Sequence, residues 1–149
     1  MQYAMVINNR TVSLVAYGTD RNWLDQLPTQ GWLCVLVVEE KRRTYTDEVV
    51  AKLLLRDVAW VCAVGAAGEW AHDLLDEEIV FREVESQYLP PHEVMTTWHD
   101  EVEECLWFAL FAAHTEAVPL EHVAVLDLTK GTALPAIKAY LETLVAGAE

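Results

Sequence analysis

Four side chains suited to acid–base chemistry or cation binding lie at or just after apolar runs that are typical of β-strands. They are Glu39, His99, Asp100 and Asp127. Carboxylates bind divalent cations, and carboxylates and imidazoles can transfer protons. Open parallel sheets bind ligands in the crevice at the carboxyl ends of their strands. If these strands pair in parallel, we expect the four side chains to meet in that crevice.

The same residues also fit a protein without an active site, because turns between strands and helices are rich in polar residues. Asp100 and Glu103 together have the D-x-x-E form of a helix N-terminal capping box. This pattern gives Asp100 a structural role at the start of the next helix. The sequence therefore leaves open whether the four residues form a site.

A glycine-containing turn, G-A-A-G-E at residues 65–69, follows one apolar run and opens a predicted helix. Phosphate-binding loops occupy this position, because glycine lets backbone N–H groups approach an anion at a helix start. Gly65 and Gly68 are therefore candidate ligand-binding residues. The segment lacks the G-x-G-x-x-G and G-K-[ST] motifs, and Glu69 would repel a phosphate in the first turn. We favour a tight turn without a ligand.

The cysteines and histidines lack the spacing of a metal site, since the chain has no H-E-x-x-H and no C-x-x-C motif. Cys34, Cys62 and Cys105 each lie inside an apolar run, which predicts buried, reduced thiols and a cytoplasmic location. The two serines, Ser13 and Ser86, do not lie at a strand-to-helix elbow. We expect no metal ion, no cofactor and no nucleophilic catalysis.

The chain has six tryptophans, which is many for 149 residues. Three of them fit core positions: Trp60, Trp70 and Trp107. The other three lie near the ends of predicted elements, where an exposed indole can anchor a protein partner. They are Trp23, Trp32 and Trp98, and core packing is the alternative for each of them.

The charge of the chain is strongly negative, at −14 from 24 acidic and 10 basic residues. A surface of this sign repels phosphate backbones, so we expect no nucleic-acid binding. It favours solubility or a basic protein partner. No apolar stretch approaches the ~18 residues of a membrane-spanning helix, and the first residues lack a signal-peptide pattern. We therefore expect a cytoplasmic protein that does not enter a membrane.

The length fits one domain over residues 1–149. Runs 32–38, 58–64 and 122–128 are apolar on both faces, which is typical of parallel strands covered by helices. A more polar run at 94–99 predicts a fourth strand nearer an edge. The alternation with helices predicts a three-layer α/β sandwich with a mainly parallel sheet, Rossmann-like or flavodoxin-like. An N-terminal hairpin is expected to extend one edge in the antiparallel direction.

Hydrophobic periodicity predicts four helices, over residues 47–56, from 69 to at least 77, from about 100, and over 132–145. We expect Thr44 or Thr46 to cap the first. Residues 79–81 could continue the second helix or form a short strand. The third is expected to bury one wide apolar surface, formed by Val102, Leu106, Trp107, Leu110 and Phe111.

The stretch T-W-H-D-E at 97–101, followed by L-W-F-A-L at 106–110, resembles a motif in a small bacterial family of uncharacterised α/β proteins. The resemblance covers only part of the chain and implies no activity. It implies that Trp98, His99 and Asp100 matter together.

Two functions from different classes fit these observations. The first is an acidic protein-interaction module that binds a basic partner, as accessory or immunity proteins do. The alternative is a small-ligand or divalent-metal-dependent enzyme that uses the carboxyl-end crevice of the predicted sheet.

Overall fold

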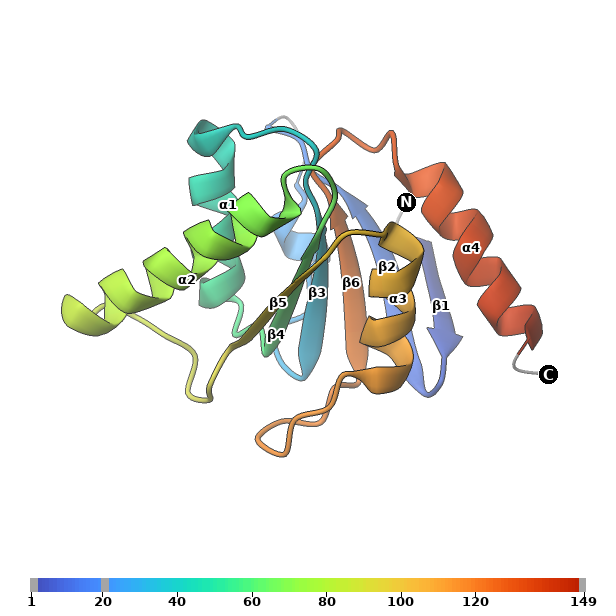
Figure 1. The fold of residues 1–149 in the computed structure, drawn as a ribbon. Helices are drawn as coiled ribbons and strands as arrows, with labels where there is room; N and C mark the ends of the chain where they lie inside the picture. The colour runs from blue at the N-terminus through green and yellow to red at the C-terminus, as the bar shows by residue number, and fades with distance from the viewer. Residues whose placement is uncertain (1–2, 20–21, 148–149) are drawn as a thin grey trace.

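The computed structural model describes residues 3–19 and 22–147, which form one six-stranded sheet and four α-helices (Figure 1). The sheet order is β1-β2-β6-β3-β4-β5. All neighbouring strands pair in parallel except β1 and β2. The strands are β1 (Tyr3–Ile7), β2 (Arg10–Ala16), β3 (Trp32–Val37), β4 (Trp60–Val64), β5 (Met95–His99) and β6 (His122–Asp127).

The helices pack on both faces of this sheet. Buried residues of α1 and α2 form one core cluster with one face, and those of α3 and α4 form a second cluster with the other. A short 3-10 turn, η1, precedes β3, and a π-helical segment, η2, continues α3. Their bounds are η1 (Leu24–Gln26), α1 (Arg43–Leu55), α2 (Gly68–Val84), α3 (Val102–Trp107), η2 (Phe108–Ala112) and α4 (Leu134–Gly147).

The predicted parallel pairing of the three doubly apolar runs is confirmed. β3 lies between β6 and β4, and all its residues are buried. Alternate β3 side chains enter the two core clusters, with Cys34 in one and Val35 in the other. Burial on both sides explains why these strands are apolar throughout rather than alternating. The more polar β5 lies at one edge of the sheet, as predicted.

The predicted hairpin forms the other edge, with β1 antiparallel to β2. Asn8 and Asn9 connect the strands with φ of 52° and 63°, a conformation that asparagine tolerates and that two-residue hairpin loops require. β2 itself runs parallel to β6. The hairpin also holds the end of η2: Asn8 Nδ2 donates to Leu110 O at 2.7 Å, and Arg10 donates to Ala109 O and to Ala113 O.

Several local predictions are wrong. α1 begins at Arg43, and its N-cap residue, Arg42, makes no side-chain capping bond. Thr46 lies within the helix and donates instead to Arg42 O at 2.7 Å. α3 begins at Val102 without the Asp100 capping box, because Glu101 occupies the N-cap position. One choice that the sequence left open has a clear outcome: residues 79–81 continue the second helix rather than forming a strand, since α2 extends to Val84.

Candidate functional site

Glu39 follows β3 and holds the turn between β4 and α2. Its Oε2 accepts a 2.8 Å hydrogen bond from the backbone N–H of Ala66. The chain's own carboxylate thus takes the N–H group that a phosphate would use in a phosphate-binding loop. Gly65 has φ +112°, and a Cβ there would lie 2.4 Å from Val38 O. Gly65 is therefore needed for a close backbone crossing, as expected of a tight turn.

Gly68 is the first residue of α2, and its environment is likewise occupied by protein. A Cβ at this position would lie 3.3 Å from the backbone carbon of Ala63. Its N–H donates to Gly65 O at 3.0 Å. Neither candidate glycine therefore has the surroundings of a ligand-binding loop.

Asp127, the last residue of β6, is fully buried and holds the turn that leads to α4. Its Oδ1 accepts hydrogen bonds from Thr129 N at 2.9 Å and Thr129 Oγ1 at 2.6 Å, and its Oδ2 accepts one from Ala133 N at 3.0 Å. A buried carboxylate that accepts three hydrogen bonds has its polar atoms satisfied and is fixed in place. This arrangement gives Asp127 a structural task.

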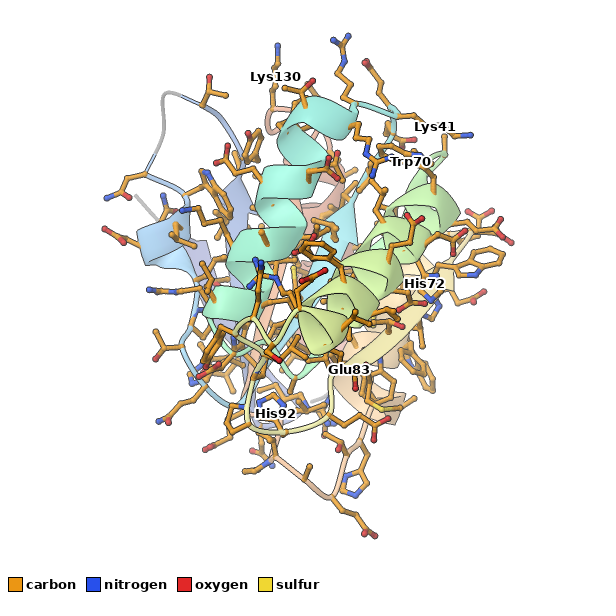
Figure 2. The ribbon with its side chains drawn as sticks, turned by 90° about the vertical axis from the view of Figure 1, so that its left-hand side faces the viewer. Lys41, Trp70, His72, Glu83, His92 and Lys130 are labelled. Carbon is orange, nitrogen blue, oxygen red and sulfur yellow. The ribbon has the colours of Figure 1, made fainter. Side chains whose placement is uncertain are left out.

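A pocket of about 430 Å³ lies beyond the ends of β3 and β6. These neighbouring strands lead to helices on opposite faces of the sheet, α1 and α4, so the pocket lies at a topological switch point. We call it the switch-point pocket. Figure 2 places Lys41 and Lys130 at this end of the molecule. The pocket is lined by Val38, Glu39, Glu40, Arg42, Tyr45, Leu128, Thr129, Lys130 and Thr132.

His99 is not brought to Glu39 or Asp127. β5 is separated from β3 by β4, and the His99 ring packs against Phe108 on the α3 side, with centroids 4.9 Å apart. His99 instead lies beside two thiols. One ligand atom each from Cys62, His99 and Cys105 lies within 4.8 Å of the others, and no second such group of three occurs among the residues described. The predicted four-residue crevice is therefore not formed.

The three grouped side chains come from β4, β5 and α3, and they are shielded from water. Cys62 and Cys105 are fully buried, and the side chain of His99 is 11% exposed. His99 Nε2 is 3.2 Å from Thr97 Oγ1, which also accepts a hydrogen bond from Trp60 Nε1. His99 Nδ1 is 3.8 Å from Glu104 Oε1. The imidazole is thus fixed between a hydroxyl and a carboxylate.

The electrostatics of the group favour one thiolate. Burial raises the pKa of Cys62, but hydrogen bonds with Cys105, His99 and Thr97 outweigh it, and the pKa is lowered. The hydrogen bond to Cys62, together with burial, raises the pKa of Cys105. The pKa of His99 is raised, and the main cause is its hydrogen bond to Cys62, with Glu104 contributing. Carboxylates at Glu39 and Asp127 are not the cause.

A comparison with protein families assigns the chain. A model described as a domain of unknown function, DUF7684, matches residues 12–144. The chain belongs to the DUF7684 family. No curated protein and no solved structure matches the sequence. The matched segment includes Cys62, His99 and Cys105, which we call the thiol–imidazole group, and every residue of the switch-point pocket. Among the described residues of this DUF7684 chain, no helix has the length and apolar character needed to cross a membrane.

The structure separates the tryptophan candidates of this DUF7684 chain. Trp32 is fully buried and donates to Arg56 O, and Trp23 is 5% exposed and packs on Tyr17, so neither presents an indole to a partner. Trp98 is exposed on the edge strand β5, and Asp100 beside it is exposed as well. Trp107 was predicted to be in the core but is half exposed.

The exposure of Trp107 could have been inferred from the sequence, because the segment of α3 and η2 has two sets of apolar residues at helical spacing and only one of them can face the core. The set that is buried has helical spacing and excludes Trp107 and Phe111. It consists of Cys105, Leu106, Ala109, Leu110 and Ala113. No comparable signal marks the thiol–imidazole group, since residues 62, 99 and 105 belong to three different elements.

Proposed function

We propose that this DUF7684 chain is a protein-interaction module of the accessory or immunity type, which binds a basic protein in the bacterial cytoplasm. One observation carries the proposal. Trp107 and Phe111 are 50% and 40% exposed, and their rings pack against each other with centroids 5.7 Å apart. Exposed aromatic clusters of this kind are typical of protein-binding surfaces, where tryptophan is enriched among the residues that contribute most affinity.

The charge around this pair favours a basic partner. Glu103 and Glu104 are exposed and lie four and three residues before Trp107, on the same helical face. The sequence has no lysine or arginine between Arg82 and Lys130. An arginine of a partner could therefore pair with these carboxylates and stack on the indole. We define the acidic aromatic surface as Glu103, Glu104, Trp107 and Phe111.

The proposed location rests on the cysteines. All three thiols are free and buried, as the sequence predicted. Free thiols are typical of reducing compartments. The strong negative charge adds a kinetic argument, because opposite charge on a partner accelerates association and discriminates against wrong partners.

We also infer that the architecture is a three-layer sandwich of the Rossmann-like or flavodoxin-like type. The support is the parallel order of β2, β6, β3, β4 and β5, with two helices packed on each face. The switch-point pocket lies where such folds bind ligands.

That pocket supports a second candidate function, binding of a small anionic ligand and chemistry on it. Two carboxylates also line the pocket, but Glu40 is paired with Arg42 at 2.6 Å and Glu39 accepts the Ala66 N–H, so Lys130 supplies the positive charge for a ligand. Hydroxyl groups come from Thr129, Thr132 and Tyr45. A ligand that binds only the folded state raises the melting temperature. Thermal melting with a panel of phosphorylated and carboxylated metabolites tests this alternative, with Lys130→Ala as the variant expected to lose any stabilisation.

Site-specific photo-crosslinking tests the interaction module. A benzophenone amino acid replaces Trp107 in one variant and Phe81 in a control, since Phe81 is also 50% exposed but lies on α2. In the source cell, position 107 is expected to give one discrete product with a protein of basic isoelectric point, and position 81 is expected to give none. Absence of a product at position 107, the same product at both positions, or an acidic captured protein would contradict the proposal.

A further inference from the structure

The group formed by Cys62, His99 and Cys105 has a donor set that neither the interaction module nor the switch-point pocket uses. Two sulfur atoms and one imidazole nitrogen are the ligands of thiophilic cations such as Zn²⁺, whereas Mg²⁺ and Ca²⁺ take oxygen ligands. We propose that Cys62, His99 and Cys105 bind one zinc-class divalent cation between β4, β5 and α3.

The spacing of the ligand atoms is close to that of a metal site. All three lie within 4.8 Å of one another. Zn–S bonds of about 2.3 Å and Zn–N bonds of about 2.0 Å place tetrahedral ligand atoms about 3.4–3.8 Å apart. A side-chain movement of about 1 Å therefore closes the site around a cation. β4 and β5 are paired strands, with Cys62 directly opposite Thr97, so two of the three ligands already sit on a shared backbone frame.

The surroundings of His99 include a carboxylate of the kind that orients a metal-bound histidine, at 3.8 Å, which is longer than a hydrogen bond. Such histidines donate the ring N–H that does not bind the metal to a carboxylate or carbonyl. His99 Nδ1 faces the Glu104 carboxylate at 3.8 Å, and Nε2 faces back along β5 toward Thr97, the residue paired with Cys62. We assign Nε2 as the metal ligand, which replaces its 3.2 Å contact with Thr97 Oγ1, and Glu104 as the carboxylate that orients the ring.

The charge balance also favours the cation. Binding takes the place of the protons on Cys105 and His99: the two thiolates and the neutral imidazole that then ligate carry −2, which a divalent cation neutralises within a core cluster of apolar side chains. Three protein ligands leave a fourth position for water or a small ligand, as in metal sites that act on a substrate.

The test uses the full chain, made metal-free with a chelator and kept reduced with a phosphine. Cobalt(II) is added first, because a thiolate-bound tetrahedral cobalt site gives a thiolate charge-transfer band and intense visible absorption. The wild type is expected to take up one equivalent with both features, and zinc is expected to displace the cobalt. Absence of these bands from the reduced, folded wild type would overturn the proposal without recourse to any variant.

Variants then assign the ligands, with zinc affinity measured by competition against a chromogenic chelator. Cys62→Ala, Cys105→Ala and His99→Ala are each expected to weaken binding by more than about 100-fold, and Glu104→Gln by about 10-fold. Cys34→Ala is the matched control, since Cys34 is an equally buried thiol in the other core cluster. Retention of affinity in Cys62→Ala, an equal loss in Cys34→Ala, or formation of a Cys62–Cys105 disulfide in place of metal uptake would each overturn the assignment.

Discussion

The carboxylate of Glu39 accepts a hydrogen bond from the backbone N–H of Ala66, at 2.8 Å, across the turn that leads into α2. The turn lies between a strand and a helix, where phosphate-binding loops are found. Here the negative group that accepts the N–H is the carboxylate of Glu39, from the segment between β3 and α1. This contact gives a structural explanation for the acidic residue after β3, and the close approach of Val38 O to residue 65 explains the glycine there.

Replacing Glu39 tests that explanation. Glu39→Ala is expected to lower the free energy of unfolding by about 1 kcal/mol, because the Ala66 N–H loses its protein acceptor but can reach water. Glu39→Gln keeps an acceptor oxygen and is expected to cost less. Urea unfolding measures both, with Glu40→Ala as the exposed neighbouring control. A Glu39→Ala variant as stable as Glu40→Ala would argue against a structural role for this carboxylate.

Substitution of Asp127 is expected to lower the free energy of unfolding more than substitution of Glu39. Asp127→Asn replaces one acceptor oxygen with an NH₂ group in a fully buried position that receives three hydrogen bonds. We expect a loss of about 2–4 kcal/mol in the free energy of unfolding. Asp100→Asn is the control, and because the structure gives Asp100 no capping bond it is expected to cost less than about 0.5 kcal/mol. A larger loss for Asp100→Asn than for Asp127→Asn would reverse the roles assigned here.

Arg10 links the hairpin to the end of η2, where its guanidinium donates to the carbonyl groups of Ala109 and Ala113. Arg10→Met keeps the aliphatic stem and removes both hydrogen bonds, so we expect a loss of about 2–3 kcal/mol. Arg43→Met, which removes the exposed ion pair of Arg43 with Asp47, is expected to cost less than about 0.5 kcal/mol. Chemical denaturation of the two variants side by side would contradict this account if their losses were equal.

The three thiols give a labelling prediction. In the native, metal-free protein all three are expected to react slowly with a bulky thiol reagent, because Cys34, Cys62 and Cys105 are buried, and all three are expected to react in denaturant. Zinc is expected to slow Cys62 and Cys105 further and to leave Cys34 unchanged. Mass spectrometry of labelled peptides resolves the three rates. Rapid labelling of any one of the three thiols in the native protein would contradict the burial of that cysteine.

The strands could be predicted because a strand that is buried on both faces has a continuous run of apolar residues, as β3 and β4 do. The hairpin could be predicted for a similar reason, since Asn8 and Asn9 suit its positive-φ turn. The starts of α1 and α3 could not, because a capping motif competes with tertiary packing, whereas α2 begins within one residue of its predicted start. Asp100 has the right spacing for a capping box, yet the chain stays extended through Glu101.

The candidate site was only partly predictable. Glu39 and Asp127 lie at the carboxyl edge as expected, but both are held by backbone N–H groups. His99 lies on the α3 side because side chains alternate along β5, and a one-residue change of register would reverse that direction. Neither the register of an edge strand nor the approach of Cys105 from α3 is encoded in local spacing. The group of Cys62, His99 and Cys105 is therefore visible only in three dimensions.

The most direct test of the proposed function is the affinity of the purified chain for the basic partner that is crosslinked through position 107. Calorimetric titration compares the wild type with Trp107→Ala and Phe81→Ala, at low and at high salt. We expect Trp107→Ala to weaken binding by about 30-fold or more, the loss typical of a central interface tryptophan, while Phe81→Ala stays near the wild type. Higher salt is expected to weaken binding, because opposite charges are screened. Equal affinity of Trp107→Ala and the wild type, a larger loss in Phe81→Ala, or binding that is indifferent to salt would contradict an acidic aromatic surface as the functional site.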